Sequence, residues 1–66
     1  MEQITDLTNE AARWDIDTLR LTNNTLVLKD VKQSGFLNMV YGYVGDCEMD
    51  VQDEWVDEDL KLVFSE

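Results

Sequence analysis

The chain has 66 residues but only one cysteine, Cys47, and no histidine. A chain this short buries only about 60% of the surface that its unfolded form exposes. Domains of this size therefore often depend on disulfides or metals. A lone cysteine forms no internal disulfide, and a tetrahedral zinc site needs four ligands, most of them Cys or His. We therefore expect residues 1–66 to form a single small acidic domain by ordinary apolar packing, helped at most by a partner subunit.

The composition agrees with a folded domain. Hydrophobic residues make up 44% of the chain, which is enough for a core and too much for a disordered acidic tail. No apolar run approaches the roughly 20 residues needed to cross a bilayer, and the N-terminus has neither the basic start nor the hydrophobic segment of a signal peptide. We expect a cytoplasmic protein with a reduced thiol, located in the host cytoplasm if a phage encodes it.

Two hydrophobic periods divide the first half of the chain. A spacing of three and four residues predicts a short N-terminal helix with one apolar stripe; the stripe consists of Ile4, Leu7, Ala11 and Trp14. From Ile16 the period changes to two, which predicts a β-hairpin with strands over about 17–22 and 25–31. Asn23 and Asn24 stand between these strands, and asparagine tolerates the positive φ that a two-residue hairpin turn requires.

The segment 33–45 carries no charge, although 30% of the whole chain is charged. Apolar residues fall on both sides of an extended strand there, which predicts a central strand covered on both faces. Gly42 within it indicates a bulge. The pair Gly45-Asp46 predicts a turn, followed by a strand with its apolar side chains inward; these are Cys47, Met49 and Val51.

The C-terminal segment is compatible with two structures. As a helix, residues 52–59 place Trp55 and Val56 toward the core and four acidic residues on the opposite side. The strict alternation of Leu60, Leu62 and Phe64 instead predicts a strand. We expect a helical turn followed by this last strand. The predicted fold class is α+β, with a short N-terminal helix packed on a four- or five-stranded antiparallel sheet.

The chain lacks the residue patterns of an enzyme. It has no histidine for acid–base chemistry, and Ser34 and Ser65 have no basic partner nearby in the sequence. Cys47, with acidic neighbours, is interpreted as a core residue. The glycines fit no phosphate-binding spacing. We therefore expect no catalytic activity and no cofactor.

One partial metal motif overlaps the acidic region. Acidic residues occupy positions 1, 3, 5, 9 and 12 of a twelve-residue calcium loop; they are Asp46, Glu48, Asp50, Glu54 and Asp57. Position 6 should be glycine and is Val51, and position 12 should be glutamate and is an aspartate. The predicted site residues therefore include no metal ligand.

The net charge of −10 is concentrated in one segment. Eight acidic residues and no basic one lie between residues 46 and 59, and we call these eight residues the acidic stripe: Asp46, Glu48, Asp50, Asp53, Glu54, Asp57, Glu58 and Asp59. A row of exposed carboxylates imitates a nucleic-acid backbone, which places one phosphate every 3.4 Å or so along each strand. The competing interpretation is a solvated surface that maintains solubility, but such a surface normally mixes both signs of charge.

This charge predicts the class of partner. We expect the acidic stripe to bind a basic nucleic-acid-binding protein, and we expect no direct binding to nucleic acid or to anionic membranes, because both repel a negative protein. Trp55 lies inside the stripe and is interpreted as a core anchor. In size and composition the chain resembles small acidic inhibitors from phages and mobile elements, which include DNA mimics, anti-restriction proteins and anti-CRISPR proteins. These proteins share no motif, so the resemblance assigns no residue.

The expected function is therefore inhibition, by an acidic nucleic-acid mimic that blocks the basic site of a nucleic-acid-handling host protein. Immunity proteins and antitoxins share this composition and are one alternative. A second alternative is a small structural or assembly subunit that binds through the uncharged segment 33–45. A homodimer that buries this segment is compatible with either function.

Overall fold

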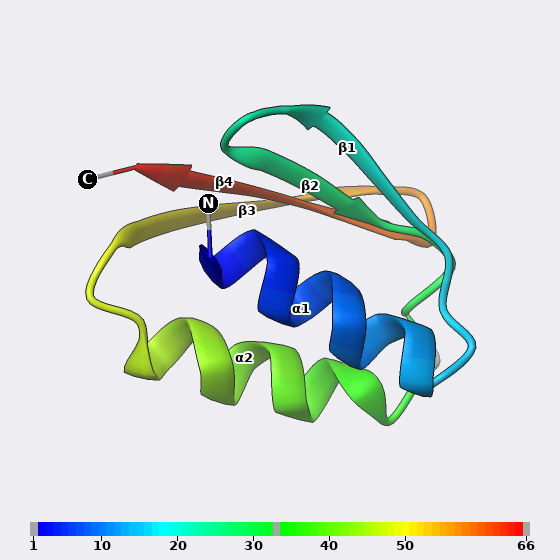
Figure 1. Ribbon diagram of the computed structural model, residues 1–66. Helices are drawn as coiled ribbons and strands as arrows, with labels where there is room; N and C mark the ends of the chain where they lie inside the picture. The colour runs from blue at the N-terminus through cyan, green and yellow to red at the C-terminus, as the bar shows by residue number, and fades with distance from the viewer. Residues whose placement is uncertain (1, 33, 66) are drawn as a thin grey trace.

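The computed structural model describes residues 2–32 and 34–65 and shows a two-layer α+β fold (Figure 1). The elements, in chain order, are α1 (Glu2–Arg13), β1 (Thr18–Thr22), β2 (Thr25–Leu28), α2 (Phe36–Asp46), β3 (Asp50–Val56) and β4 (Asp59–Ser65). The strands form one antiparallel sheet in the order β1-β2-β4-β3. Both helices lie on the same side of this sheet (Figure 1). The predicted α+β class is confirmed, and the second helix is an addition to it.

The N-terminal helix α1 ends in a Schellman motif. The amide of Ile16 donates to the carbonyl of Ala11 at 2.9 Å, and the amide of Asp15 donates to the carbonyl of Ala12 at 3.2 Å. Asp15 has a φ of 58°, the left-handed conformation that this motif requires and that glycine usually supplies. The aspartate therefore ends the helix at some conformational cost.

The core lies between the two helices and the two central strands. Alternate residues of β4 are fully buried, as their spacing predicts, because every second side chain of a strand points to the same face. The buried core consists of Ile4, Leu7, Ala11, Leu26, Leu28, Val31, Phe36, Val40, Leu60, Leu62 and Phe64. Trp14, the last member of the predicted helical stripe, lies beyond α1 and is half exposed, with its ring centroid 5.8 Å from that of Phe36.

The predicted hairpin is confirmed, with Asn23 and Asn24 as its turn. The positive φ expected of these asparagines is not found, since the described non-glycine residues with positive φ are Asp15, Asp30 and Asp57. The register shifts between Arg20 and Thr22, so β1 has an irregularity near this turn. The carbonyl of Asn24 also accepts a hydrogen bond from the amide of Phe64 at 2.8 Å. The hairpin is thereby fixed to the end of β4.

The prediction of a central strand over 33–45 is wrong, because the described part of this segment contains α2. Gln33 lies outside the described residues. Phe36 and Val40, four residues apart, are the buried residues of this helix, and that spacing is the helical period. The predicted bulge at Gly42 is absent because Gly42 lies inside α2. An apolar run this rich fits either period, so burial against α1 and the sheet decides the structure.

Two further predictions near the C-terminus are wrong. Gly45-Asp46 is the last part of α2, and Cys47 to Met49 form a connection and not a strand. Residues 52–59 are not helical, since β3 runs straight through Asp50–Val56 and turns at Asp57-Glu58 into β4. Asp57 has a φ of 56°, which suits a two-residue hairpin turn and not a helix.

Candidate functional site

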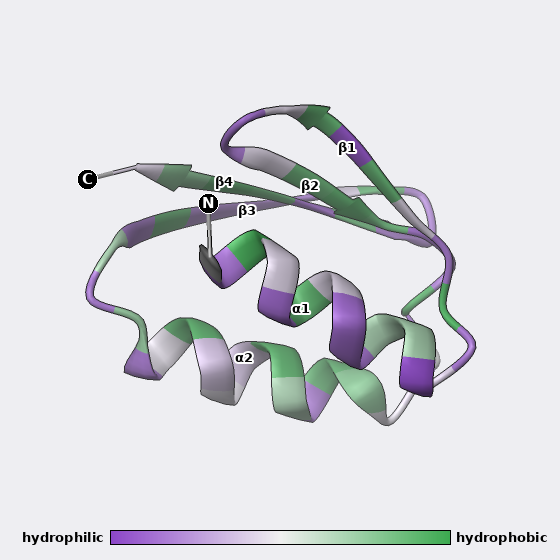
Figure 2. Cartoon of the chain, viewed as in Figure 1, coloured by the Kyte–Doolittle hydropathy of each residue, from purple (hydrophilic) through white to green (hydrophobic). Residues whose placement is uncertain are grey.

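The acidic stripe follows one edge of the sheet, because β3 is an edge strand. Its residues begin at the end of α2 and continue along β3 and around the β3–β4 turn. Seven of the eight side chains are exposed, and Asp59 is partly buried. Figure 2 shows hydrophilic colour over much of β3 and the turn that follows it. The fold therefore gathers the predicted site residues along one side of the molecule, although the helical row expected within 52–59 does not form.

The carboxylates of β3 lie on both faces of the sheet. Asp53 pairs with Leu62 and lies on the helix-covered face, whereas Glu54 pairs with Lys61 and lies on the open face. Asp50 shares the open face with Glu54, four residues away and therefore roughly 13 Å along the strand. A strand rises about 3.3–3.4 Å per residue, close to the axial spacing of phosphates in one DNA strand. Asp50, Asp53 and Glu54 are unevenly spaced and lie on both faces, so the edge concentrates negative charge without repeating this regular spacing.

Few cations neutralise this edge. Among the described residues, Lys61 lies opposite Glu54 in the register, and Lys29 pairs with Asp59. Lys32 is exposed and follows Val31, whose amide donates to the carbonyl of Glu58 at 2.9 Å. Arg13 pairs with Glu10 on α1 at 3.0 Å, and Arg20 lies on β1, the opposite edge of the sheet. The stripe is therefore left with most of its charge uncompensated.

Asp59 has a structural role that the sequence did not reveal. Its carboxylate accepts hydrogen bonds from Lys29 Nζ and from the amide of Asp30, both at 2.8 Å. The hydrogen bond from Lys29, followed by that from the Asp30 amide, lowers the pKa of Asp59 below its usual value. The same hydrogen bond raises the pKa of Lys29. Asp59 therefore ties the loop after β2 to the β3–β4 turn, while the other seven acids face solvent.

Two exposed aromatic side chains stand beside the stripe. Trp55 is 37% exposed, so its interpretation as a core anchor is wrong; an edge strand has no outer neighbour to cover it. Tyr41 of α2 is 43% exposed, and its hydroxyl donates to Asp53 Oδ2 at 3.4 Å. Sequence reasoning missed Tyr41 because it placed this residue on a strand. Its helical offset from Phe36 and Val40 is the signal that could have found it.

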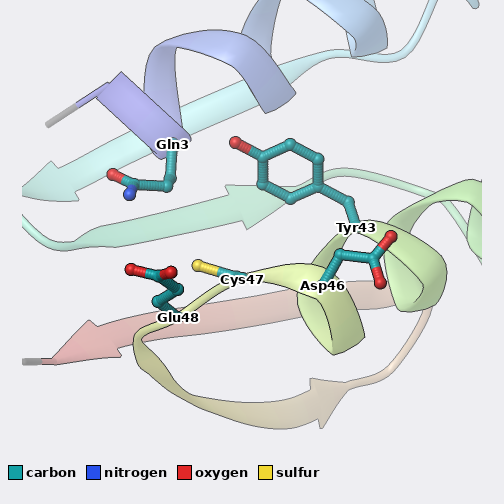
Figure 3. Close-up of a pocket in the computed structure, with 5 residues that line it drawn as sticks. All are labelled: Gln3, Tyr43, Asp46, Cys47 and Glu48. Atoms are coloured by element: carbon teal, nitrogen blue, oxygen red, sulfur yellow. The ribbon is translucent and has the colours of Figure 1, made fainter.

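A hollow of about 400 Å³ lies at one end of the stripe, between the start of α1 and the end of α2. Figure 3 shows the Cys47 thiol and the Glu48 carboxylate projecting from the connection after α2 toward Gln3, with the Tyr43 ring on another side. Asp46 completes the lining. Cys47 is partly buried and packs against the core, in agreement with its predicted role. Among the described residues, no basic side chain lines the hollow.

The partial calcium motif does not converge in space. Its residues 46–57 run from the end of α2 through a connection into the extended strand β3, so the carboxylates are spread along an edge. Within residues 2–32 and 34–65, no three acidic, cysteine or histidine side chains gather as metal ligands. In the same part of the chain, no helix is both long and apolar enough to span a bilayer.

Comparison of the chain with protein families, with curated proteins and with solved structures gave no match.

Proposed function

We propose that this protein is an inhibitor that presents its acidic stripe to the basic nucleic-acid-binding site of another protein, as an acidic mimic of a nucleic acid. The observation that carries the proposal is the placement of the stripe. Seven exposed carboxylates follow one edge of the sheet and its two ends, and only Lys61 among the described cations faces an acid of β3 in register. The proposed host protein is a nuclease, restriction enzyme, CRISPR effector or similar protein, in the manner of phage and mobile-element inhibitors.

Electrostatics explains how such an inhibitor would act. A concentrated negative edge attracts a basic groove over a distance of about one Debye length and accelerates association. Opposite charges contribute mainly to the rate of association and to specificity. Trp55 and Tyr41, exposed beside Asp53, supply aromatic groups of the kind that dominate binding energy in protein interfaces. The stripe therefore combines charge for steering with aromatic contacts for retention.

The assembly-subunit alternative has less support than the main proposal. Its contact segment forms a helix in which Phe36 and Val40 are fully buried and Leu37 and Met39 are partly buried, although Tyr41 is exposed. Immunity proteins and antitoxins would use the same charge complementarity against a basic nuclease or toxin, so they differ from the main proposal in the target and not in the mechanism.

The test is a displacement titration with matched charge variants. The immobilised protein captures partners from bacterial lysate, and these partners are ranked by the salt concentration that releases them. Each captured DNA-binding protein is then loaded with labelled duplex DNA. The parent should displace this DNA, and its apparent affinity should fall steeply with salt. The stripe variant Asp53→Asn, Glu54→Gln, Asp57→Asn and Glu58→Gln should bind at least about tenfold more weakly, a loss of roughly 1.4 kcal/mol.

The control variant removes the same number of charges elsewhere: Asp6→Asn, Glu10→Gln, Asp15→Asn and Asp17→Asn. Asparagine tolerates the positive φ of Asp15 and of Asp57 in the stripe, so both variants should keep the fold. The proposal predicts that the control variant displaces DNA nearly as well as the parent. Equal losses in the two variants would mean that only net charge matters, and the mimicry proposal would be rejected.

A further inference from the structure

One face of the sheet has no covering layer. Both helices lie on the opposite face (Figure 1), yet the uncovered face carries apolar side chains. Leu19 and Leu21 of β1 are 50% and 51% exposed, although a solvent-facing strand usually alternates apolar residues inward with polar residues outward. The register places Leu19 beside Val27, and Val27 beside Lys61. Apolar groups therefore extend from the edge into the centre of the open face.

We define the open-face patch as Leu19, Val27 and Val63; the exposed Leu21 follows at the register shift of β1. Val27 and Val63 lie on the two central strands and are partly exposed. The rest of the same face, on β3, is mostly polar and acidic: it holds Asp50, Gln52 and Glu54 and ends with Val56, which is 52% exposed. The open face thus has an apolar half and an anionic half, which meet where Lys61 lies opposite Glu54.

The charge of the chain decides which occupant suits this face. A second copy would bring together two chains that each carry a net charge of −10, and an anionic lipid surface would repel the same charge. A partner that presents apolar side chains beside Lys or Arg would fill the patch and pair with the carboxylates of β3. Within the described strands, Lys61 is the cation of this face and lies opposite Glu54, so Asp50 has no basic partner in register.

We infer that the open face of the sheet is a docking surface for an apolar-and-basic segment of the inhibited protein. Apolar side chains of that segment lie on the open-face patch, and its Lys or Arg side chains contact Asp50 and Glu54. The inference rests on the proposed function and extends the interface from the edge of the sheet onto its open face. Burial of apolar surface resists salt, whereas exposed charge pairs are screened. Part of the binding free energy should therefore remain at high salt.

The test uses two synthetic peptides with the same number of lysines. One peptide has helical spacing with leucine on one side and lysine on the other; the second has serine in place of every leucine. At about 0.3 M salt, where the Debye length is shorter than its 8 Å physiological value, the parent should bind the leucine peptide at least about tenfold more tightly. This ratio corresponds to roughly 1.4 kcal/mol.

Two variants separate the halves of the face. Leu19→Ser with Leu21→Ser should abolish the preference for the leucine peptide, and Asp50→Asn with Glu54→Gln should weaken both peptides equally. Trp14→Ser is the matched control, because Trp14 is also half exposed but lies at the end of α1. Trp14→Ser should retain the preference for the leucine peptide. Melting curves show that each variant is folded at the temperature of the titration.

Each remaining outcome has a definite meaning. If the leucine variant keeps the preference, or the parent has none, the docking inference is wrong while the charge-based function stands. If the carboxylate variant binds both peptides like the parent, the proposed function fails as well. If sedimentation shows a parent dimer that Leu19→Ser with Leu21→Ser dissociates, a second copy covers the face and the inference is overturned.

Discussion

Replacing Trp55 by alanine tests whether the edge of β3 is part of the core or part of a contact surface. A fully buried aromatic side chain removes about 150–250 Å² from water, and Trp55 is 37% exposed. It therefore covers roughly 100–150 Å², worth at most about 2.5–4 kcal/mol at 25 cal/mol per Å². Alanine retains part of this burial, and the unfolded chain is already partly compact. We expect Trp55→Ala to lower the free energy of unfolding by about 1–2 kcal/mol.

Phe64→Ala is the reference variant, because Phe64 is fully buried on β4. Truncating a buried phenylalanine typically costs about 3–5 kcal/mol, since a cavity remains. Urea unfolding followed by circular dichroism gives both values, and each kcal/mol should move Tm by about 4–8 °C in a domain of this size. If Trp55→Ala proves as costly as Phe64→Ala, Trp55 is a core residue and the exposed edge described above is incorrect.

The same variant should affect binding more than folding. Truncating an interface tryptophan often costs 2 kcal/mol or more of binding free energy, about a thirtyfold loss or greater. Trp55→Phe keeps an aromatic ring and should recover most of the affinity. A Trp55→Ala protein that displaces DNA as well as the parent would show that the partner does not contact this part of the stripe.

Three further variants test the local structure. Asp15→Gly should raise the free energy of unfolding by about 1 kcal/mol, because glycine adopts the φ of 58° at the end of α1 without strain; thermal melting should show a higher Tm, and an unchanged Tm would contradict this. Asp57→Val should lower the free energy of unfolding by about 1–2 kcal/mol because of its φ of 56°, whereas Glu58→Val beside it should stay within about 0.5 kcal/mol. Since hydrogen bonds lower the pKa of Asp59 in the folded chain, its contribution to stability is present above the unfolded pKa of 3.8 and is lost as pH falls through the folded pKa. Asp59→Asn should flatten the dependence of unfolding on pH in this acidic window, as measured by urea unfolding at a series of pH values; an unchanged profile would refute the assigned pairing.

Strong periodicity made part of the fold predictable from the sequence. Ile4, Leu7 and Ala11 recur at helical spacing and are buried in α1, and Leu60 and Leu62 alternate and are buried in β4. Each pattern fits only one period, so the element follows from local sequence. The position of the hairpin turn at Asn23-Asn24 was also predictable, but neither asparagine adopts the positive φ on which that prediction rested.

The secondary structure was not predictable where the hydrophobic pattern fits both a helix and a strand. The described residues 34–45 are apolar on every side, and burial of Phe36 and Val40 selects the helix through tertiary packing. Residues 52–59 are polar apart from Trp55 and Val56, and the conformation of this segment follows from pairing with β4. The sequence located the acidic stripe, but its arrangement along an edge depended on the strand order. The bond from Asp59 to Lys29 joins residues 30 positions apart, so no local pattern could indicate it.

Protection of the sheet edge is a competing reason for the acids of β3, because charges on an edge strand prevent pairing with other chains. The sheet has a second edge for comparison. Strand β1 carries one charged side chain, Arg20, together with a register shift near its end, and its half-exposed leucines make it the edge in greater need of protection. If protection governed the charges, they would be distributed between the two edges or placed mainly on β1. The fold instead places Asp50, Asp53 and Glu54 on β3 and continues the acidic stripe beyond both ends of that strand. Edge protection alone does not explain this one-sided excess, whereas the proposed recognition of a basic partner would.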